Sequence, residues 1–231
     1  MPVNKRKVAV FDVDGTIFRS SLLIHIVDAL IAAKLFPIEA EAVFERARQD
    51  WLERAGDYET YIAKVVEANM QYIKGVPYAA FATVVEAVVT RERKKTYKFT
   101  RDLVAELKRD NYYLAAISQS YKFALDVFLA EIGFDKVYGR MYEIGPENRF
   151  TGEITDLHLI ANKANIVRRL VEREGLDLDG SIAIGDTEDD IPVLEMVRRA
   201  IAFNPNMKLY KHAKRMGWEI VVERKDVIYK I

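Results

Sequence analysis

The stretch VAVFDVDGTIF, residues 8–18, places two aspartates two residues apart at the end of an apolar run. Its first four residues are apolar in succession, which predicts a short strand buried on both faces of a parallel sheet. Asp12 and Asp14 follow where that strand should end. Two carboxylates at this point repel each other and lose hydration unless a positive charge lies between them. The stretch therefore predicts a site for a hard cation at the mouth of a sheet.

The 231-residue chain has the composition of a globular protein. Half of its residues are hydrophobic and 30% are charged, which argues against a disordered chain and against a membrane bundle. Basic and acidic residues each number 35, so no overall basic field favours nucleic acid, and any phosphate recognition has to be local. The sequence has no cysteine, which excludes a thiolate nucleophile and fits a reducing compartment.

The N-terminal segment MPVNKRK resembles the basic start of a signal peptide. However, Asp12 and Asp14 interrupt the apolar stretch that follows, and no cleavage pattern of small residues comes after it. The apolar stretch at residues 21–36 carries a histidine and an aspartate and is shorter than the roughly 20 residues of a membrane span. We expect a cytoplasmic protein with no membrane span.

Residues 19–98 show helical periodicity. Apolar residues recur at helical spacing over residues 22–31 and 44–52, and segments 58–73 and 78–89 predict two further helices. No strand pattern interrupts this succession, so we expect an inserted, all-helical cap domain at residues 19–98, with hinges near its two ends.

From residue 99 onward helices and strands alternate, which predicts a parallel sheet with ligands at the carboxyl ends of its strands. The expected fold class is α/β, with a Rossmann-like core formed by residues 1–18 and 99–231. We predict strands at residues 112–117, 181–184 and 200–203, a hairpin at 138–155, and helices at 100–109 (capped by Thr100), 121–131, 158–174 and 191–197.

Polar residues follow three of the predicted strands. Asp12, Asp14 and Thr16 follow the first, Ser118 ends the second, and the acidic stretch GDTEDD, residues 185–190, follows the third. Lys163 lies near the start of a predicted helix. A parallel sheet would bring all of these residues to one crevice.

This ordered set resembles the motifs of the haloacid dehalogenase superfamily phosphatases. Those motifs are Asp-x-Asp-x-Thr after the first strand, a Ser or Thr ending a second strand, a helical Lys, and Gly-Asp-x-x-x-Asp. The resemblance covers residues 5–18 and 99–222, and the helical insertion is similar in size to the cap of the phosphoserine phosphatase-like subfamily. The matching residues are Asp12, Asp14 and Thr16; Ser118; Lys163; and Gly185, Asp186 and Asp190.

The resemblance implies a Mg²⁺-dependent phosphatase, because a carboxylate can attack a phosphate dianion only when a cation screens the charges. Asp12 is then the nucleophile that forms an aspartyl-phosphate. Asp14 protonates the leaving alkoxide and later takes a proton from the hydrolytic water. The metal ligands implied are Asp12, Asp186 and the backbone carbonyl of Asp14.

The remaining matched residues are implied to act around the phosphoryl group. Thr16, Ser118 and Lys163 would hold its oxygens and stabilise the transition state. Asp190 would orient Lys163 or a metal-bound water, with Asp189 in a supporting position.

Each residue also has a structural interpretation. Asp14 followed by Gly15 is a common turn pair, and Thr187 with Asp190 fits a helix capping box. Ser118 or Lys163 alone would usually be structural or solvated. Their occurrence together, in this order, favours the functional interpretation.

The substrate is expected to differ from phosphoserine. In phosphoserine phosphatases a Glu holds the substrate ammonium where this chain has Ser21, a cap Arg grips the carboxylate where it has Val65, and two glycines follow the second motif where it has Gln119 and Ser120. A site without these partners discriminates poorly for phosphoserine. We therefore expect a small or amphiphilic phosphate ester, contacted through some of Phe18, Arg19, Ser21, Gln119 and Tyr121.

Two alternatives stay open. A phosphotransferase would pass the same aspartyl-phosphate to an acceptor alcohol. A phospholigand-binding module would keep the fold without turnover, although retention of Asp12, Asp14 and Lys163 argues against it. Dehalogenation is disfavoured, because a halide leaving group needs no proton from Asp14.

Overall fold

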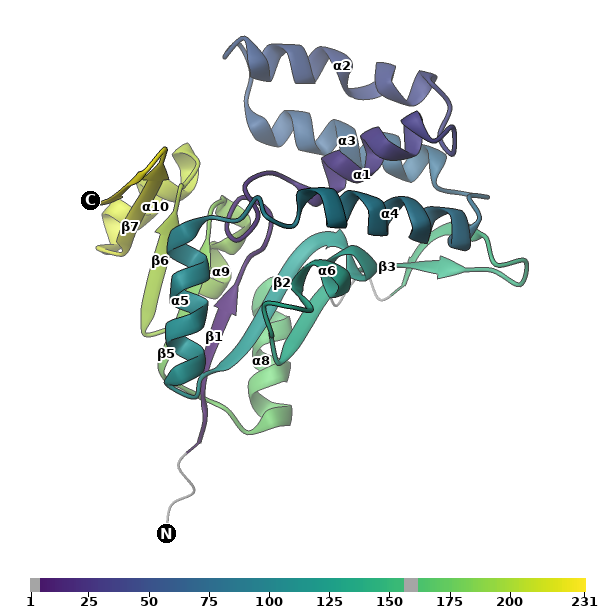
Figure 1. The fold of residues 1–231 in the computed structure, drawn as a ribbon. Helices are drawn as coiled ribbons and strands as arrows, with labels where there is room; N and C mark the ends of the chain where they lie inside the picture. Colours follow the sequence, from purple (N-terminus) through teal and green to yellow (C-terminus); the bar gives the residue numbers. More distant parts are fainter. Residues whose placement is uncertain (1–4, 156–161) are drawn as a thin grey trace. The chain divides into compact units, whose positions relative to one another are not determined.

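The computed structural model describes residues 5–155 and 162–231 (Figure 1). Its described residues form two compact units. The core unit takes its residues from 1–20, 94–139 and 156–231, and the helical unit consists of 21–93 and 140–155.

The described residues form an eight-stranded, mostly parallel sheet in the order β4-β3-β2-β1-β5-β6-β7-β8, in which β4 is Phe150–Thr155 and β3 is Lys136–Ile144. β1 pairs in parallel with β2 on one side and with β5 on the other, β6 and β7 continue in parallel, and β8 closes the edge antiparallel to β7. The predicted α/β fold class is therefore confirmed. The core strands are β1 (Lys7–Phe11), β2 (Tyr113–Tyr121), β5 (Asp177–Gly185), β6 (Arg199–Phe203), β7 (Glu219–Arg224) and β8 (Val227–Lys230).

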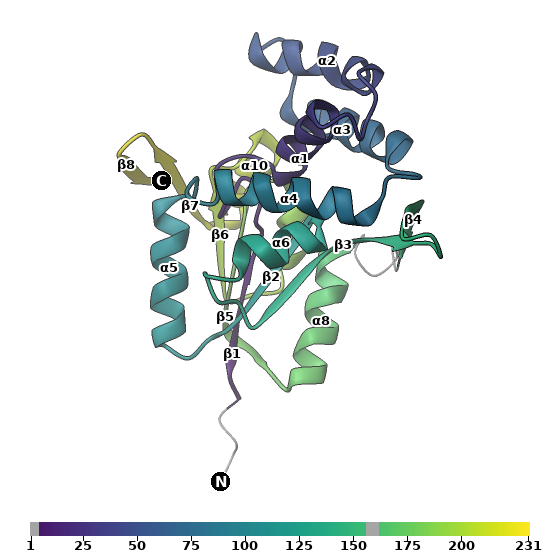
Figure 2. The ribbon, with the colours of Figure 1, turned by 45° about the vertical axis from the view of Figure 1, so that its right-hand side comes forward.

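Helices cover both faces of the core sheet, because alternate strand residues point to opposite sides. One face packs against α8 (Lys163–Glu174), α9 (Ile191–Leu194) and α10 (Met207–Met216). The other packs against α5 (Lys98–Arg109) and α6 (Lys122–Leu129), with the ring of Phe99 stacked on that of Phe203 at 5.6 Å. Figure 2 shows α5 and α8 on opposite sides of the strands. This covering on both faces explains why VAVF is continuously apolar.

The helical unit contains four helices and most of a hairpin. α2 packs on α3, and α1 packs on both α3 and α4. β3 passes from the core unit into this unit, where it pairs antiparallel with β4. These elements are α1 (Leu22–Ala32), α2 (Glu39–Leu52), α3 (Tyr58–Tyr72), α4 (Tyr78–Glu92), β3 (Lys136–Ile144) and β4 (Phe150–Thr155).

We predicted a hairpin at residues 138–155 as part of the core, but residues 140–155 pack with the helices instead. The Phe150 ring lies 4.9 Å from that of Phe81, and the Phe150 N–H donates to the Val76 carbonyl at 3.0 Å. Asn69, fully buried in α3, donates to the Tyr142 hydroxyl at 3.0 Å. The inserted unit is therefore not all-helical, because two β strands complete its apolar core.

Three local expectations differ from the structure. Thr100 does not cap α5; it lies inside the helix and its hydroxyl donates to the Thr16 carbonyl at 2.9 Å, while the Glu223 carboxylate accepts the N–H groups of Lys98 and Phe99. β2 continues three residues beyond Ser118. α9 ends at Leu194, three residues earlier than expected.

The end of the chain carries elements that we did not predict, namely α10, β7 and β8. Of the helix expected at residues 158–174, residues 158–161 lie outside the described part of the chain, and α8 begins at Lys163. Among the described residues, no helix is long and apolar enough to cross a membrane.

The two segments that connect the first insertion to the core pair with each other. The Arg19 N–H donates to the Lys95 carbonyl at 2.8 Å, and the Tyr97 N–H donates to the Ile17 carbonyl at 3.0 Å. An antiparallel bridge joins Phe18 and Thr96 between these bonds. At this first insertion the chain thus leaves and re-enters the core unit through one short two-stranded ribbon.

Candidate active site

The loop after β1 presents the first aspartates. Asp12 follows the strand directly, and its N–H donates to the Ile184 carbonyl on β5 at 2.9 Å. The loop then turns tightly, because the N–H groups of Ile17 and Phe18 both donate to the Val13 carbonyl at 2.9 Å. The pair Asp14-Gly15 therefore lies in a tight turn, as its structural interpretation predicts, and this turn also belongs to the candidate site.

Lys163 connects this loop to the acidic stretch after β5. Its ammonium Nζ lies 2.7 Å from Asp12 Oδ1 and 2.6 Å from Asp190 Oδ1, and all three side chains are less than 10% exposed. Asn162 caps α8 by accepting the N–H of Asn165, which places Lys163 in the first turn. Burial lowers the pKa of Lys163, but the two carboxylates outweigh it and raise that pKa above its usual range.

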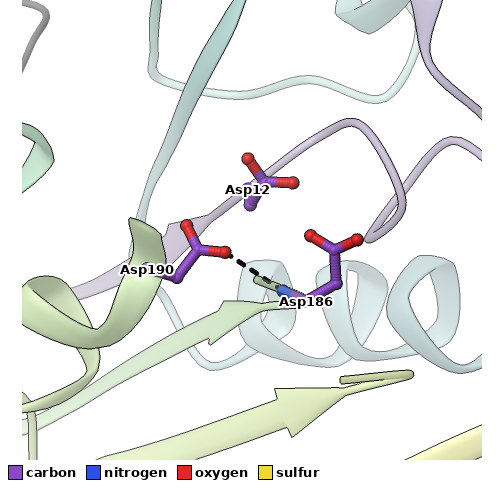
Figure 3. A group of neighbouring side chains, drawn as sticks. All are labelled: Asp12, Asp186 and Asp190. Carbon is purple, nitrogen blue, oxygen red and sulfur yellow. Dashed lines mark hydrogen bonds between the residues drawn. The ribbon is translucent and has the colours of Figure 1, made fainter. Parts of the chain in front are cut away.

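Three carboxylates converge after β1 and β5 (Figure 3). Asp12, Asp186 and Asp190 each place an oxygen within 4.8 Å of the others. Burial raises the pKa of Asp12 to about 7, although Lys163 lowers it and Asp190 raises it further. Burial also raises the pKa of Asp186 well above its usual value, with the charge of Asp12 next in effect. One ammonium thus faces more negative charge than it can neutralise.

Both carboxylate oxygens of Asp190 accept hydrogen bonds from the protein. Its Oδ1 accepts from Lys163, and its Oδ2 accepts the N–H groups of Asp186 at 3.1 Å and Thr187 at 3.3 Å. The predicted capping box of Thr187 and Asp190 is present on a short 3₁₀ helix, Glu188–Asp190. Asp190 therefore caps this helix and orients Lys163 at the same time.

Two buried polar atoms at the site have no hydrogen-bond partner among the described residues. They are Asp12 Oδ2 and the hydroxyl oxygen of Thr16, a residue that is completely buried. Buried polar groups are normally paired, so such atoms point to partners that the protein itself does not supply. Asp12 Oδ2 can bind a cation or a proton, and the Thr16 hydroxyl can donate to an acceptor such as a phosphoryl oxygen.

Asp14 is held separately by β2. Its Oδ2 accepts the hydroxyl of Ser118 at 2.7 Å and that of Ser120 at 2.8 Å. We did not predict Ser120 as a site residue. The signal was available, since residues 118 and 120 lie on the same side of a strand that continues past Ser118.

The remaining predicted residues lie apart from these hydrogen bonds. Phe18 is completely buried, and its ring packs against Phe128 at 5.4 Å. Asp189 and Arg19 are exposed, and Gln119 is half-buried. Ser21 and Tyr121 are at most 3% exposed.

Position 15 requires glycine for two reasons, its left-handed backbone conformation and the close approach of Asp186. Its φ is +79°, and an added Cβ would lie 1.9 Å from Asp186 Oδ2. We expect Gly15→Ala to lower the free energy of unfolding by more than the roughly 1–2 kcal/mol that a left-handed alanine costs. The matched control is Gly175→Ala, because Gly175 has φ +61° with nothing within 4 Å. Urea unfolding of both variants checks this, and equal losses would contradict the contact with Asp186.

Comparisons with known proteins identify the family of the chain. A model of the haloacid dehalogenase-like hydrolase family matches residues 9–195. A phosphoserine phosphatase of Archaeoglobus fulgidus is 27% identical over 201 residues, covering 87% of this chain and 53% of the relative. A phosphoserine phosphatase of Methanocaldococcus jannaschii is 22% identical over 224 residues, covering 96% and 95%. The chain thus spans about half the length of the first relative and almost all of the second.

Solved structures show the same fold. A protein with unknown function from Bordetella pertussis Tohama I matches with a TM-score of 0.74 at 22% identity, covering 94% of this chain and 98% of that one. A phospho-aspartyl intermediate analogue of phosphoserine phosphatase matches with a TM-score of 0.64 at 19% identity, covering 96% of each. From the family match, the chain belongs to the haloacid dehalogenase-like hydrolase family, and within it the chain is similar to these phosphoserine phosphatases.

Proposed function

We propose that the chain is a Mg²⁺-dependent phosphomonoesterase that works through an aspartyl-phosphate on Asp12. The observation that carries the proposal is the environment of Asp12: one carboxylate oxygen is held by Lys163, and the other is buried with no hydrogen-bond partner among the described residues. A nucleophile has to be oriented and yet open to its target. The cysteine-free sequence supports a cytoplasmic location.

The oxygen atoms of the site fit Mg²⁺. Both oxygens of Asp190 accept hydrogen bonds from the protein, whereas Asp12 Oδ2 accepts none from the described residues, so we choose Asp12 and its neighbour Asp186 from the three carboxylates for the cation. We propose that these two, with the backbone carbonyl of Asp14, hold Mg²⁺, a hard cation that prefers oxygen ligands. When bound, it screens the charge of the phosphate dianion so that a carboxylate can approach the phosphorus.

The chain's own residues then divide the reaction between them. Asp12 attacks the phosphorus and displaces the alkoxide, and Asp14 gives that alkoxide a proton. Thr16, Ser118 and Lys163 hold the phosphoryl oxygens. Asp14, now a carboxylate, takes a proton from the water that hydrolyses the aspartyl-phosphate and restores Asp12.

We propose a small or amphiphilic phosphate ester other than phosphoserine as the substrate. The relatives named phosphoserine phosphatase support a phosphomonoester. The residues that would bind the amino acid part do not match, since Val65 is completely buried and apolar and Ser21 is uncharged. A pocket without these charges has little to distinguish phosphoserine from other esters.

The test is phosphate release from a panel of alkyl and aryl phosphate esters that includes phosphoserine. Wild-type enzyme is assayed with Mg²⁺, with EDTA, and with Mg²⁺ restored after EDTA, and each assay is repeated with an acceptor alcohol. Release that depends on Mg²⁺ supports the proposal. Transfer to the alcohol in preference to water would make the protein a phosphotransferase. No turnover of any ester would refute a phosphatase, and strong preference for phosphoserine would refute the substrate argument.

Metal binding should stabilise the protein more at high pH than at low pH. The pKa of Asp12 is raised from 3.8 to about 7, so the folded state without metal binds a proton that the unfolded chain has released. The stability from this group is complete at low pH and is lost as the pH rises through about 7. A cation replaces that proton.

We therefore expect the melting temperature in EDTA to fall between about pH 5 and about pH 8. Saturating Mg²⁺ should restore about 2.7 kcal/mol at one hundred times its dissociation constant, and more of this gain should appear at the higher pH. Asp186→Asn should reduce the gain, whereas Asp110→Asn, a change of an exposed residue at the end of α5, should not. An equal effect of Mg²⁺ on the wild type and on Asp186→Asn would contradict the assignment.

A further inference from the structure

Two serine hydroxyls of β2 donate to the same oxygen of Asp14. Ser118 Oγ lies 2.7 Å and Ser120 Oγ 2.8 Å from Asp14 Oδ2, and both serines are 2% exposed. The backbone N–H of Ser120 also donates to Ser118 Oγ at 2.9 Å. Ser118 therefore accepts one hydrogen bond and donates its single hydrogen to Asp14.

This arrangement has to change when a phosphate ester binds. A serine hydroxyl has one hydrogen, so Ser118 cannot donate to Asp14 and to a phosphoryl oxygen together. If Ser118 turns to the phosphoryl group, as in the proposed function, Asp14 Oδ2 loses the hydrogen bond from Ser118. Ser120 keeps its hydrogen bond, because nothing in the proposed reaction requires its hydroxyl elsewhere.

We propose that Ser120 is a positioning residue that holds Asp14 through the proton transfer, an inference that rests on the proposed function. An oxygen that accepts a hydroxyl hydrogen is a poor site for a further proton, so holding Oδ2 leaves Oδ1 to carry it. During alkoxide departure the Oδ1–H bond breaks and an O–H bond forms on the leaving oxygen. Asp14 ends as a carboxylate with Ser120 still donating to Oδ2.

The inference predicts an effect that depends on the leaving group. An alkoxide needs the proton from Asp14, whereas p-nitrophenolate leaves without one. General acid catalysis contributes roughly 10²–10⁴-fold, and misplacing the acid forfeits part of this. A purely structural loss would lower the turnover of both kinds of ester by the same factor.

The experiment compares kcat/KM of wild type, Ser120→Ala and Ser120→Thr for the fastest alkyl ester of the panel and for p-nitrophenyl phosphate, with Mg²⁺ present. We expect Ser120→Ala to lose about tenfold on the alkyl ester and much less on the aryl ester, and Ser120→Thr to recover the alkyl activity. The control Ser181→Ala removes another fully buried hydroxyl of the core unit, which donates to the Leu178 carbonyl. Melting temperatures establish that each variant is folded and responds to Mg²⁺.

Equal losses on the two esters, no loss on the alkyl ester, or no recovery in a folded Ser120→Thr would overturn the role of Ser120 while leaving the phosphatase intact. A wild type with no Mg²⁺-dependent release from any ester would overturn both proposals.

Discussion

Asp12→Asn should reduce Mg²⁺-dependent phosphate release by roughly 10⁴-fold or more, the scale seen when a covalent nucleophile is removed. The amide oxygen of Asn can still accept the hydrogen bond from Lys163, so the shape of the site is preserved. Its amide group cannot attack phosphorus, and it no longer offers a charged oxygen to the metal. The loss should therefore appear in kcat for every ester, including those with good leaving groups.

The intermediate itself can be trapped. Quenching the wild type during turnover and reducing it with borohydride should convert the acyl phosphate at position 12 into homoserine, which peptide mapping detects. Asp110→Asn makes the same chemical change at an exposed position and should keep full activity. A preparation of Asp12→Asn with a tenth or more of wild-type activity would refute the covalent mechanism.

Lys163→Met should affect stability and activity together. The variant keeps an unbranched side chain of similar length but removes the only ammonium that the structure shows bound to Asp12 and Asp190. Breaking a buried ion pair by removing one partner costs roughly 3–5 kcal/mol, because the remaining charges stay buried without compensation. In the proposed function Lys163 also donates to the phosphoryl oxygens, so kcat should fall by roughly 10²–10³-fold. Urea unfolding in EDTA and steady-state kinetics with Mg²⁺ measure the two effects.

A second substitution separates charge from packing. Lys163→Met combined with Asp190→Asn removes one of the facing carboxylates, so the double variant should be more stable than Lys163→Met alone, by roughly 0.5–3 kcal/mol. If the double variant is instead destabilised by the sum of the two single losses, the interaction of Lys163 with Asp190 is not electrostatic. Unchanged unfolding of Lys163→Met in EDTA would show that the buried ion pair contributes nothing.

Much of the site was predictable because its residues lie at strand ends. The loop after β1 and the acidic stretch after β5 follow apolar runs that can only be buried strands, and a parallel order brings such ends together. Ser118, unlike the aspartates, does not follow the end of its strand. β2 continues to Tyr121, beyond the point where its residues change from apolar to polar. Ser120 was missed for the same reason. The Ser120 hydroxyl is buried and donates to Asp14 instead of to water. The residue type alone does not distinguish a buried serine from a solvated one.

The fold was less predictable where contacts are distant in sequence. The sequence of residues 138–155 predicts a hairpin, but only contacts with residues distant in sequence, such as the packing of Phe150 against Phe81, assign residues 140–155 to the helical unit. The start of α5 depends on Glu223, more than 120 residues away, and not on the nearby Thr100. Helix α10 and the strands after it contain none of the candidate site residues. The alternation of apolar and polar residues in these strands is also too short to predict them.

The paired ribbon at Arg19 and Lys95 brings the two ends of residues 20–94 together in the core unit. Because the two ends of this segment are already joined by backbone hydrogen bonds, its length can change without shifting the register of β1 against β2. Asp12, Asp14, Ser118, Lys163, Asp186 and Asp190 all belong to the core unit. Insertions or deletions within residues 20–94 would thus leave these side chains in the positions that the sheet of the core unit gives them.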